Sequence, residues 1–157
     1  MDIAKKIIDC FNKGNKLMII GNGGSAEMAS HMAAEFINRF EHDRKPLPAI
    51  ALTDIANITS IANDSNYKWI FQRPLAALGK PGDILIIFTT TDHLSITPHS
   101  QNWYTHSENI THAVNQAHLQ AIEVIFAPRI GGGTAEKQEN QLKWLHEVCR
   151  EVELHYI

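Results

Sequence analysis

The sequence has few cysteines, no long hydrophobic run and no early apolar segment. Only Cys10 and Cys149 are cysteines among 157 residues, so we expect no disulfide framework and interpret both as reduced thiols of a cytoplasmic protein. The longest apolar stretches, residues 17–20 and 84–88, are far below the ~18 residues of a membrane span. Residues 1–6 become charged too soon for a secretion signal.

An excess of basic residues is also lacking. Fourteen Lys and Arg stand against seventeen Asp and Glu, giving a formal charge of −3, which argues against a nucleic-acid partner. Hydrophobic residues make up 44% and charged residues 20%, values typical of a globular protein. At roughly 150 residues per domain, the length predicts a single domain over residues 1–157.

Segments with helical periodicity alternate with short apolar segments. Strands are predicted at residues 16–20, 47–52, 84–88 and 121–127. Asp2 is expected to cap a first helix that ends at Gly14, and further helices are predicted at residues 25–39, 54–62, 67–77, 107–120 and 134–154. Residues 92–106 are predicted to be irregular. This alternation indicates an α/β fold, a three-layer sandwich with a mostly parallel sheet.

A glycine-rich turn follows the first predicted strand and precedes a helix: Gly21, Asn22, Gly23, Gly24 and Ser25. Glycines let backbone N–H groups converge, and the N-terminus of the helix adds a positive partial charge, so the turn could hold a phosphate. Ser25 is expected to be both the N-cap and a hydroxyl donor to that phosphate. A tight turn without a ligand is the alternative.

The same turn matches a loose dinucleotide fingerprint through Gly21, Gly23 and Ala26. That interpretation requires an acidic residue at the end of the second strand. The acids at the required distance, Glu41 and Asp43, precede the second predicted strand, so dinucleotide binding is disfavoured.

His31 and Glu35 lie four residues apart on the helix that leaves this turn, and therefore on one helix face. A histidine and a carboxylate at this spacing can chelate a metal or act as an acid–base pair. A surface contact without function is the common alternative for such a pair, and its place after a phosphate-type turn favours function.

Other polar residues are expected near the same crevice, because ligands of open α/β sheets gather beyond the carboxyl ends of the strands. Three hydroxyl residues, Thr89, Thr90 and Thr91, follow the strand at 84–88, and Asn63 and Asp64 follow a helical stretch. Each set is equally compatible with ordinary turn chemistry.

The last predicted helix has Thr134 as its expected cap and an apolar stripe that includes Cys149, which we interpret as a core thiol. Gln138 and His146 lie eight residues apart on this helix, about 12 Å along its axis. His146 borders the stripe, and a half-buried histidine without function is the alternative to a catalytic one.

Several of these segments resemble the phosphoheptose isomerases, a family of sugar isomerase (SIS) domains. The resemblance covers roughly two thirds of the chain and is carried by the runs GNGGSA at 21–26, HMAAEF at 31–36, RF at 39–40, LPAIALT at 47–53, IAND at 61–64, GKPGDILI at 79–86 and TAEKQE at 134–139, with His146. It implies an SIS-type, flavodoxin-like fold that is shortened relative to the family. It also implies a cytoplasmic isomerase that converts sedoheptulose 7-phosphate into glycero-manno-heptose 7-phosphate, a step in the synthesis of heptose precursors of lipopolysaccharide.

The resemblance also implies roles for particular residues. Glu35 matches the base that moves a proton between two carbons, and His146 matches its acid–base partner; both roles suit an aldose–ketose shift through an enediol. Bacterial members bind zinc at the positions of His31, Glu35, Gln138 and His146, and a metal could polarise the carbonyl. Contacts to substrate come from the positions of Asn22, Gly23, Gly24, Ser25, Glu35, Asn63, Asp64, Thr89, Thr90, Thr91 and Gln138. Family sites lie between subunits of a homotetramer, so a homo-oligomer is expected.

The sequence departs from the family pattern in three places. The phosphate loop reads TTTDHL at 89–94 where the family has STSGNS, and the carboxylate of Asp92 would repel a phosphate unless it points away or pairs with a cation. The helical region before the first strand is shorter, and a stretch that usually includes a strand is lacking between Ala127 and Thr134. These departures favour a second hypothesis, a non-catalytic SIS module that senses a sugar phosphate or binds a protein. A dinucleotide enzyme is the third hypothesis.

Overall fold

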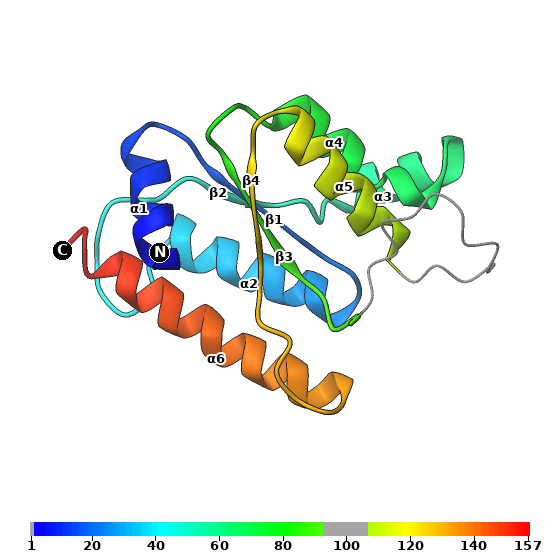
Figure 1. The fold of residues 1–157 in the computed structure, drawn as a ribbon. Helices are drawn as coiled ribbons and strands as arrows, with labels where there is room; N and C mark the ends of the chain where they lie inside the picture. The colour runs from blue at the N-terminus through cyan, green and yellow to red at the C-terminus, as the bar shows by residue number, and fades with distance from the viewer. Residues whose placement is uncertain (1, 93–106) are drawn as a thin grey trace.

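The computed structural model describes residues 2–92 and 107–157, which form one parallel sheet with helices on both faces (Figure 1). The sheet has four strands in the order β2-β1-β3-β4. The strands are β1 (Leu17–Gly21), β2 (Ala49–Ala51), β3 (Ile84–Phe88) and β4 (Glu123–Phe126). The helices are α1 (Ile3–Asn12), α2 (Gly24–Ile37), α3 (Ile55–Asp64), α4 (Gln72–Leu78), α5 (Glu108–Leu119) and α6 (Thr134–Glu153). Of the stretch predicted to be irregular, residues 93–106 lie outside the described part.

The two central strands, β1 and β3, are buried along their whole length. Successive side chains of a strand point to opposite faces, and the core is divided accordingly. Leu17 and Ile19 pack with α1, α2 and α6, whereas Met18 and Ile20 pack with α4 and α5. A strand buried on both faces requires a continuous apolar run, which the sequence provides. The predicted three-layer α/β sandwich is confirmed.

One predicted helix, residues 67–77, is wrong as a single element. The structure has a short 3-10 helix, η1 (Tyr67–Trp69), followed by α4. Proline lacks a backbone N–H and fits only the first turn of an α-helix. Pro74 therefore places the start of α4 at Gln72 and prevents one continuous helix through residue 74.

The helix caps agree with the sequence in one case and differ in two. Asp2 caps α1 as predicted, because its Oδ1 accepts a hydrogen bond from the N–H of Ala4 at 3.1 Å. Ser25 is not the cap of α2: Gly23 holds that position with a φ of +56°, so Ser25 lies buried inside the first turn. Thr134 is likewise the first residue of α6, and Gly133 precedes it as the cap. At both sites a glycine makes the turn, so the helix boundary falls before the hydroxyl residue.

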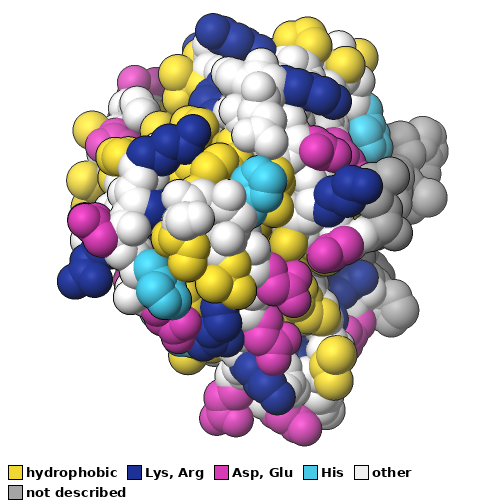
Figure 2. Space-filling model, turned by 90° about the vertical axis from the view of Figure 1, so that its left-hand side faces the viewer, with side chains coloured by type: hydrophobic (Ala, Val, Ile, Leu, Met, Phe, Trp, Pro, Cys, Tyr) yellow, Lys and Arg dark blue, Asp and Glu magenta, His cyan; other side chains and the backbone are white. Residues whose placement is uncertain are grey.

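No helix in the described part of the chain is long and apolar enough to cross a membrane. The C-terminal residues lie near α1 in Figure 1. The hydroxyl of Tyr156 donates to Oδ1 of Asn12, the last residue of α1, at 3.1 Å. Figure 2 shows the left-hand side of Figure 1 face-on, where Lys and Arg side chains are interspersed with Asp and Glu. This mixed pattern agrees with the small net charge.

Candidate functional site

The candidate phosphate cradle consists of the glycine-rich turn at residues 21–25 and the threonine segment at residues 89–91. It lies where β1 and β3 end side by side. Gly21, the last residue of β1, is paired with Phe88, the last residue of β3. The chain leaves β1 toward α2, while β3 leads toward the part of the chain that returns as α5, on the other face. Such a reversal of strand order opens a crevice in doubly wound sheets, and it is where their ligands bind. The structure therefore brings the glycine-rich turn and the Thr89–Thr91 segment to the same end of the sheet, beyond the carboxyl ends of β1 and β3.

The turn after β1 requires glycine at its first position. A Cβ on Gly21 would lie 2.4 Å from the carbonyl oxygen of Ser25, which is closer than real atoms approach. Gly23, the cap of α2, contributes no side chain to its first turn, so the positive end of that helix is not covered by a capping side chain. The N-terminus of a helix after a glycine-rich turn is a typical binding site for an anion.

Gln138 reaches this turn from α6. A Cβ built on Gly24 would lie 2.7 Å from Nε2 of Gln138, so the amide rests directly over the glycine backbone. Gln138 is half-buried there. The resemblance implies Gln138 both as a substrate contact and as a zinc ligand, and both roles stay predictions.

Asn22 is held by two residues that the sequence analysis missed. Its side chain exchanges two hydrogen bonds with Asn109 of α5, at 3.0 and 2.7 Å, and its Oδ1 also accepts from the hydroxyl of Tyr67 at 3.3 Å. Asn109 lies 87 positions away in the sequence and is buried. No local pattern marks Asn109 or Tyr67, because only the packing of α5 and η1 beside β1 brings them to the turn.

The threonine segment is held from behind through its carbonyl groups. Gln141 Nε2 donates to the carbonyl of Thr89 at 2.9 Å, Lys137 Nζ to that of Thr90 at 3.4 Å, and Arg129 to that of Thr91 at 2.7 Å. Three donors from α6 and the segment before it therefore hold the backbone carbonyls of this loop. No motif or spacing in the sequence marks these three donors.

Asp92 pairs with a cation, which is the condition under which it would not repel a phosphate. Nζ of Lys137 lies 2.7 Å from both carboxylate oxygens of Asp92. The Lys137 side chain is only 7% exposed, so its charge is directed at this loop rather than at solvent. Within the loop, the hydroxyl of Thr91 contacts that of Ser107 at 3.1 Å, and its N–H donates to Thr89 Oγ1 at 3.1 Å.

Asn63 and Asp64 occupy the last turn of α3, rather than following the helix as predicted. Both are exposed, and Asn63 donates to the carboxylate of Asp64 at 2.8 Å. Their contact with a substrate stays a prediction.

The candidate acid–base cluster consists of His31 and Glu35 of α2 and His146 of α6, and it lies further along both helices. His31 Nε2 lies 2.9 Å from Oε1 of Glu35, and the His31 ring meets the ring of His146 edge-on at a centroid distance of 5.2 Å. Phe40 stacks on His146 at 5.3 Å. His31 thus bridges the two proposed acid–base residues, which remain accessible: the Glu35 side chain is 21% exposed and His146 is half-buried.

Cys149 lies behind this cluster and is a core thiol, as predicted, with 1% exposure. Burial raises the pKa of the Cys149 thiol, and the nearby Glu35 carboxylate raises that pKa further. The thiol therefore stays protonated and takes no part in acid–base chemistry at neutral pH.

The donor types proposed for zinc are suitable, but they do not form a metal site in this arrangement. Two histidines and a glutamate are a known ligand set for catalytic zinc. Across residues 2–92 and 107–157, however, no three His, Cys, Asp or Glu side chains are grouped so that they could hold a metal ion. Gln138 contacts Gly24 and lies about 12 Å along α6 from His146. Zinc binding stays a prediction.

Comparison with known proteins identifies the family. The SIS domain model matches residues 1–92. The chain is similar to the phosphoheptose isomerase of Shewanella sediminis, with 53% identity over 91 residues, which are 57% of this chain and 46% of the relative. It is 40% identical to the phosphoheptose isomerase of Thiobacillus denitrificans over 136 residues, 85% of this chain and 62% of the relative. The chain thus spans between about half and two thirds of these relatives.

A solved structure gives the same result at the level of the fold. The structure of a phosphoheptose isomerase from Francisella tularensis superposes with a TM-score of 0.84 at 32% identity, over 96% of this chain and 83% of that one. Its match extends well beyond residue 92 and includes both helices that carry the candidate acid–base cluster. By its domain model, its sequence relatives and its fold, this chain belongs to the SIS domain proteins and, among them, to the phosphoheptose isomerase family.

Proposed function

We propose that residues 1–157 act as one SIS domain with phosphoheptose isomerase activity, interconverting sedoheptulose 7-phosphate and glycero-manno-heptose 7-phosphate for heptose precursors of lipopolysaccharide. One observation carries the proposal: α2 and α6 both run from the phosphate cradle to the acid–base cluster. Gly24 and Gln138 meet at the cradle, while Glu35, His31 and His146 meet further along the same helices.

The reaction is a proton transfer between two neighbouring carbons. The Glu35 carboxylate removes a proton from C1 of the ketose while protonated His146 gives a proton to the carbonyl oxygen on C2, which leaves an enediol. Glu35 then returns its proton to C2, and His146 takes the proton from the hydroxyl on C1, forming the aldehyde. Both side chains end in their starting protonation states, so the isomerisation needs no other reactant.

Two neighbouring side chains, His31 and Phe40, restrict the orientation of Glu35 and His146. His31 hydrogen-bonds to Oε1 of Glu35 and so limits the rotation of the carboxylate. Phe40 lies flat against the His146 ring and limits the rotation of the imidazole. Fixed orientation of an acid and a base relative to the substrate contributes directly to rate, because it replaces an ordering step in the transition state.

The phosphate end of the substrate is assigned to the cradle. The N-terminus of α2 attracts the anion. We expect the hydroxyls of Thr89, Thr90 and Thr91 to donate to it, and the lysine that pairs with Asp92 keeps the loop close to neutral. His31 lies seven residues beyond Gly24, about 10 Å along α2. In a seven-carbon sugar phosphate, the phosphate on C7 is far from the reacting carbons C1 and C2. Such a substrate fits this separation better than a shorter sugar phosphate would.

A homo-oligomer, tetramer or dimer, is part of the proposal, as is a cytoplasmic location. The acid–base cluster is open on one side, since His31 is 39% exposed, and a second copy could complete the site there. Cys10 and Cys149 are unpaired and buried, which is in keeping with a reducing compartment.

The direct test is conversion of sedoheptulose 7-phosphate, followed by NMR with and without added zinc. The wild type should form the aldose, and His146→Ala should abolish conversion. His118→Ala removes an exposed histidine of α5 and is the matched control, which should keep wild-type activity. Stimulation by zinc would support a metal site completed on assembly. A folded wild type without conversion would refute the proposal.

A non-catalytic SIS module is the second candidate, and the altered loop favours it. Asp92 places a carboxylate in this loop at the position where the family pattern has glycine. A sugar phosphate that raises the melting temperature without being isomerised would select this candidate. Protection by NAD instead would select the dinucleotide hypothesis.

A further inference from the structure

A buried carboxylate near the end of α6 binds the backbone of the loop that follows α2. Glu153 is 1% exposed, and its two oxygens accept hydrogen bonds from three consecutive backbone N–H groups, those of Phe40, Glu41 and His42, at 2.8, 2.8 and 2.9 Å. Burial by itself raises the pKa of Glu153, but these N–H donors outweigh it and hold the pKa below its usual range. Glu153 is therefore charged at neutral pH.

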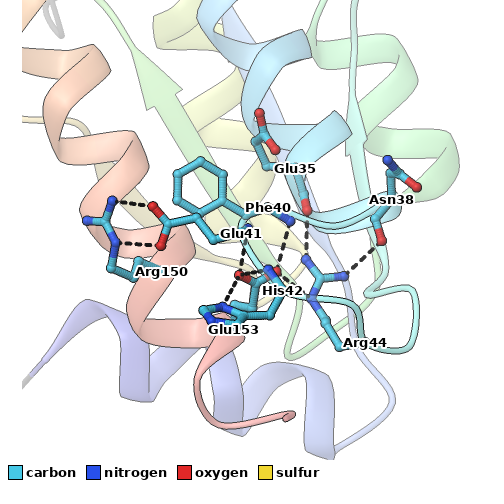
Figure 3. Close-up of polar contacts among 8 residues, drawn as sticks. All are labelled: Glu35, Asn38, Phe40, Glu41, His42, Arg44, Arg150 and Glu153. Carbon is cyan, nitrogen blue, oxygen red and sulfur yellow. Dashed lines mark hydrogen bonds and ion pairs between the residues drawn. The ribbon is translucent and has the colours of Figure 1, made fainter.

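Arg44 is the buried partner of this carboxylate. Its Nε lies 3.5 Å from Oε1 of Glu153, and both side chains are 1% exposed. The other guanidinium nitrogens donate to carbonyls at the end of α2, those of Glu35 at 2.7 Å and Phe36 at 2.8 Å (Figure 3). A cation at this position is favourable, because the last carbonyls of a helix lack partners and carry a negative partial charge.

The contacts of this ion pair lead to both proposed acid–base residues. Arg44 holds the main-chain carbonyl of Glu35, whose side chain points away from the ion pair in Figure 3. Glu153 holds the N–H of Phe40, and the Phe40 ring is stacked on His146. One ion pair therefore links the backbone of the base to the ring that orients the acid, although neither member touches either functional group.

Stability alone is a weak reason for this arrangement. A buried ion pair loses much of its attraction to the cost of removing two charges from water, and apolar residues of similar size often stabilise as much. What apolar residues cannot provide is direction: the fork of Arg44 and the two oxygens of Glu153 select named backbone groups on two different segments.

We propose that Arg44 and Glu153 are positioning residues for the proton transfer, which hold Glu35 and the Phe40–His146 stack in register. The inference rests on the proposed function for its kinetic consequences. A shift of about 1 Å in a reacting group can cost on the order of 100-fold in rate. Loss of the ion pair should therefore lower kcat on the order of 10- to 100-fold while changing KM little, because the phosphate cradle is held by other residues.

The test compares Arg44→Lys and Glu153→Gln with two controls. Lysine keeps the charge but lacks the planar fork whose two terminal nitrogens donate to the carbonyls of Glu35 and Phe36. Glutamine keeps the size but replaces one accepting oxygen with a donor. Glu41→Gln removes the exposed ion pair with Arg150, which joins the same loop to the same helix. Asp83→Asn alters another carboxylate of 1% exposure, whose partners are Asn15, Lys16 and Lys80.

Two measurements are made on each variant, kcat and KM on one hand and the NMR resonances of the His146 ring on the other. Arg44→Lys and Glu153→Gln should lower kcat, and Glu153→Gln should also shift the His146 resonances, because the stacked Phe40 ring moves. Both controls should leave kcat and these resonances unchanged. The resonances do not depend on turnover, so they test the positioning even if the wild type is inactive and the proposed function fails.

Phe40→Leu keeps the test decisive if Glu153→Gln does not fold. It removes only the half-buried ring, and it should shift the His146 resonances and lower kcat. Phe40→Tyr keeps an aromatic ring there, so the His146 resonances and kcat should stay as in the wild type. Variants of the ion pair that lower the melting temperature but leave kcat and the His146 resonances as in the wild type would overturn the inference. An unchanged kcat in Phe40→Leu would overturn it as well.

Discussion

Asp83 and Glu153 are two buried carboxylates with the same exposure and similar partners, yet they serve different regions. Each is 1% exposed, accepts hydrogen bonds from backbone N–H groups and forms an ion pair with a cationic side chain, Lys16 for Asp83 and Arg44 for Glu153. Asp83 joins Asn15, Lys16 and Lys80, which lie in the turns that lead into β1 and β3. Glu153 joins the loop that follows α2, next to Glu35 and His146. The burial and hydrogen bonds of a carboxylate therefore show only that it stabilises the fold. Whether it also supports function depends on which other residues its partners contact.

The largest expected effect is on turnover, at the proposed base Glu35. Glu35→Gln should lower turnover by a factor on the order of 100 to 10,000, because the amide cannot accept the proton. The amide is nearly isosteric, so the melting temperature and the binding of sugar phosphate should change little. Kinetics and calorimetric titration measure the two quantities. Loss of binding together with turnover would show that Glu35 holds the substrate rather than acting as the base.

The two buried carboxylates should also differ in their contribution to stability. Glu153→Ala leaves the buried Arg44 without its counter-charge, and removing one member of a buried ion pair costs about 3–5 kcal/mol. Asp83→Ala should cost less, about 1.5–3 kcal/mol for the lost charged hydrogen bonds, because the Lys16 side chain is 25% exposed and can turn to water. Urea denaturation measures both. Equal losses would show that the exposure of the cation does not decide the cost.

Acid should weaken both regions in the same direction. Burial raises the pKa of Asp83, but hydrogen bonds from Lys16, Asn15 and Lys80 outweigh it and lower that pKa, as the backbone N–H groups do for Glu153. A carboxyl whose pKa is lower in the folded state stabilises the fold above its unfolded pKa, and this stabilisation is lost as the pH falls through the folded pKa.

The free energy of unfolding should therefore decrease as the pH falls below the ordinary values, 3.8 for Asp83 and 4.5 for Glu153. Asp83→Asn and Glu153→Gln should each flatten part of this decrease, as measured by denaturation at a series of pH values. A decrease as steep as in the wild type would mean that the altered carboxyl does not contribute to it.

The smallest effect is expected where an ion pair is exposed. Arg150 lowers the pKa of Glu41 by a hydrogen bond, yet the two side chains are 45% and 42% exposed. Glu41→Gln should leave the unfolding midpoint and kcat unchanged within error, since solvent and salt screen such a pair. A clear loss of activity would extend the positioning role to the surface of the loop.

Local patterns were enough to predict much of the fold and part of the site. The apolar runs of β1 and β3, the cap at Asp2 and the facing pair His31 and Glu35 depend on neighbours only a few residues apart. The predicted helix over residues 67–77 is wrong because Pro74, which fits only the first turn of an α-helix, prevents the continuous helix that the periodicity indicates. The predicted caps at Ser25 and Thr134 failed because the preceding glycines make the turns.

The sequence by itself determined the alternation of strands and helices, the glycine turn after β1 and the i,i+4 pair on α2, because backbone geometry and periodicity are local properties. Only the tertiary structure decided that Asn109 holds Asn22, that Lys137 neutralises Asp92, and that Glu153 reaches Phe40 across 113 positions. These contacts depend on which helices pack against each face of the sheet, and a hydrogen bond between distant residues leaves no spacing in the sequence by which it could be recognised.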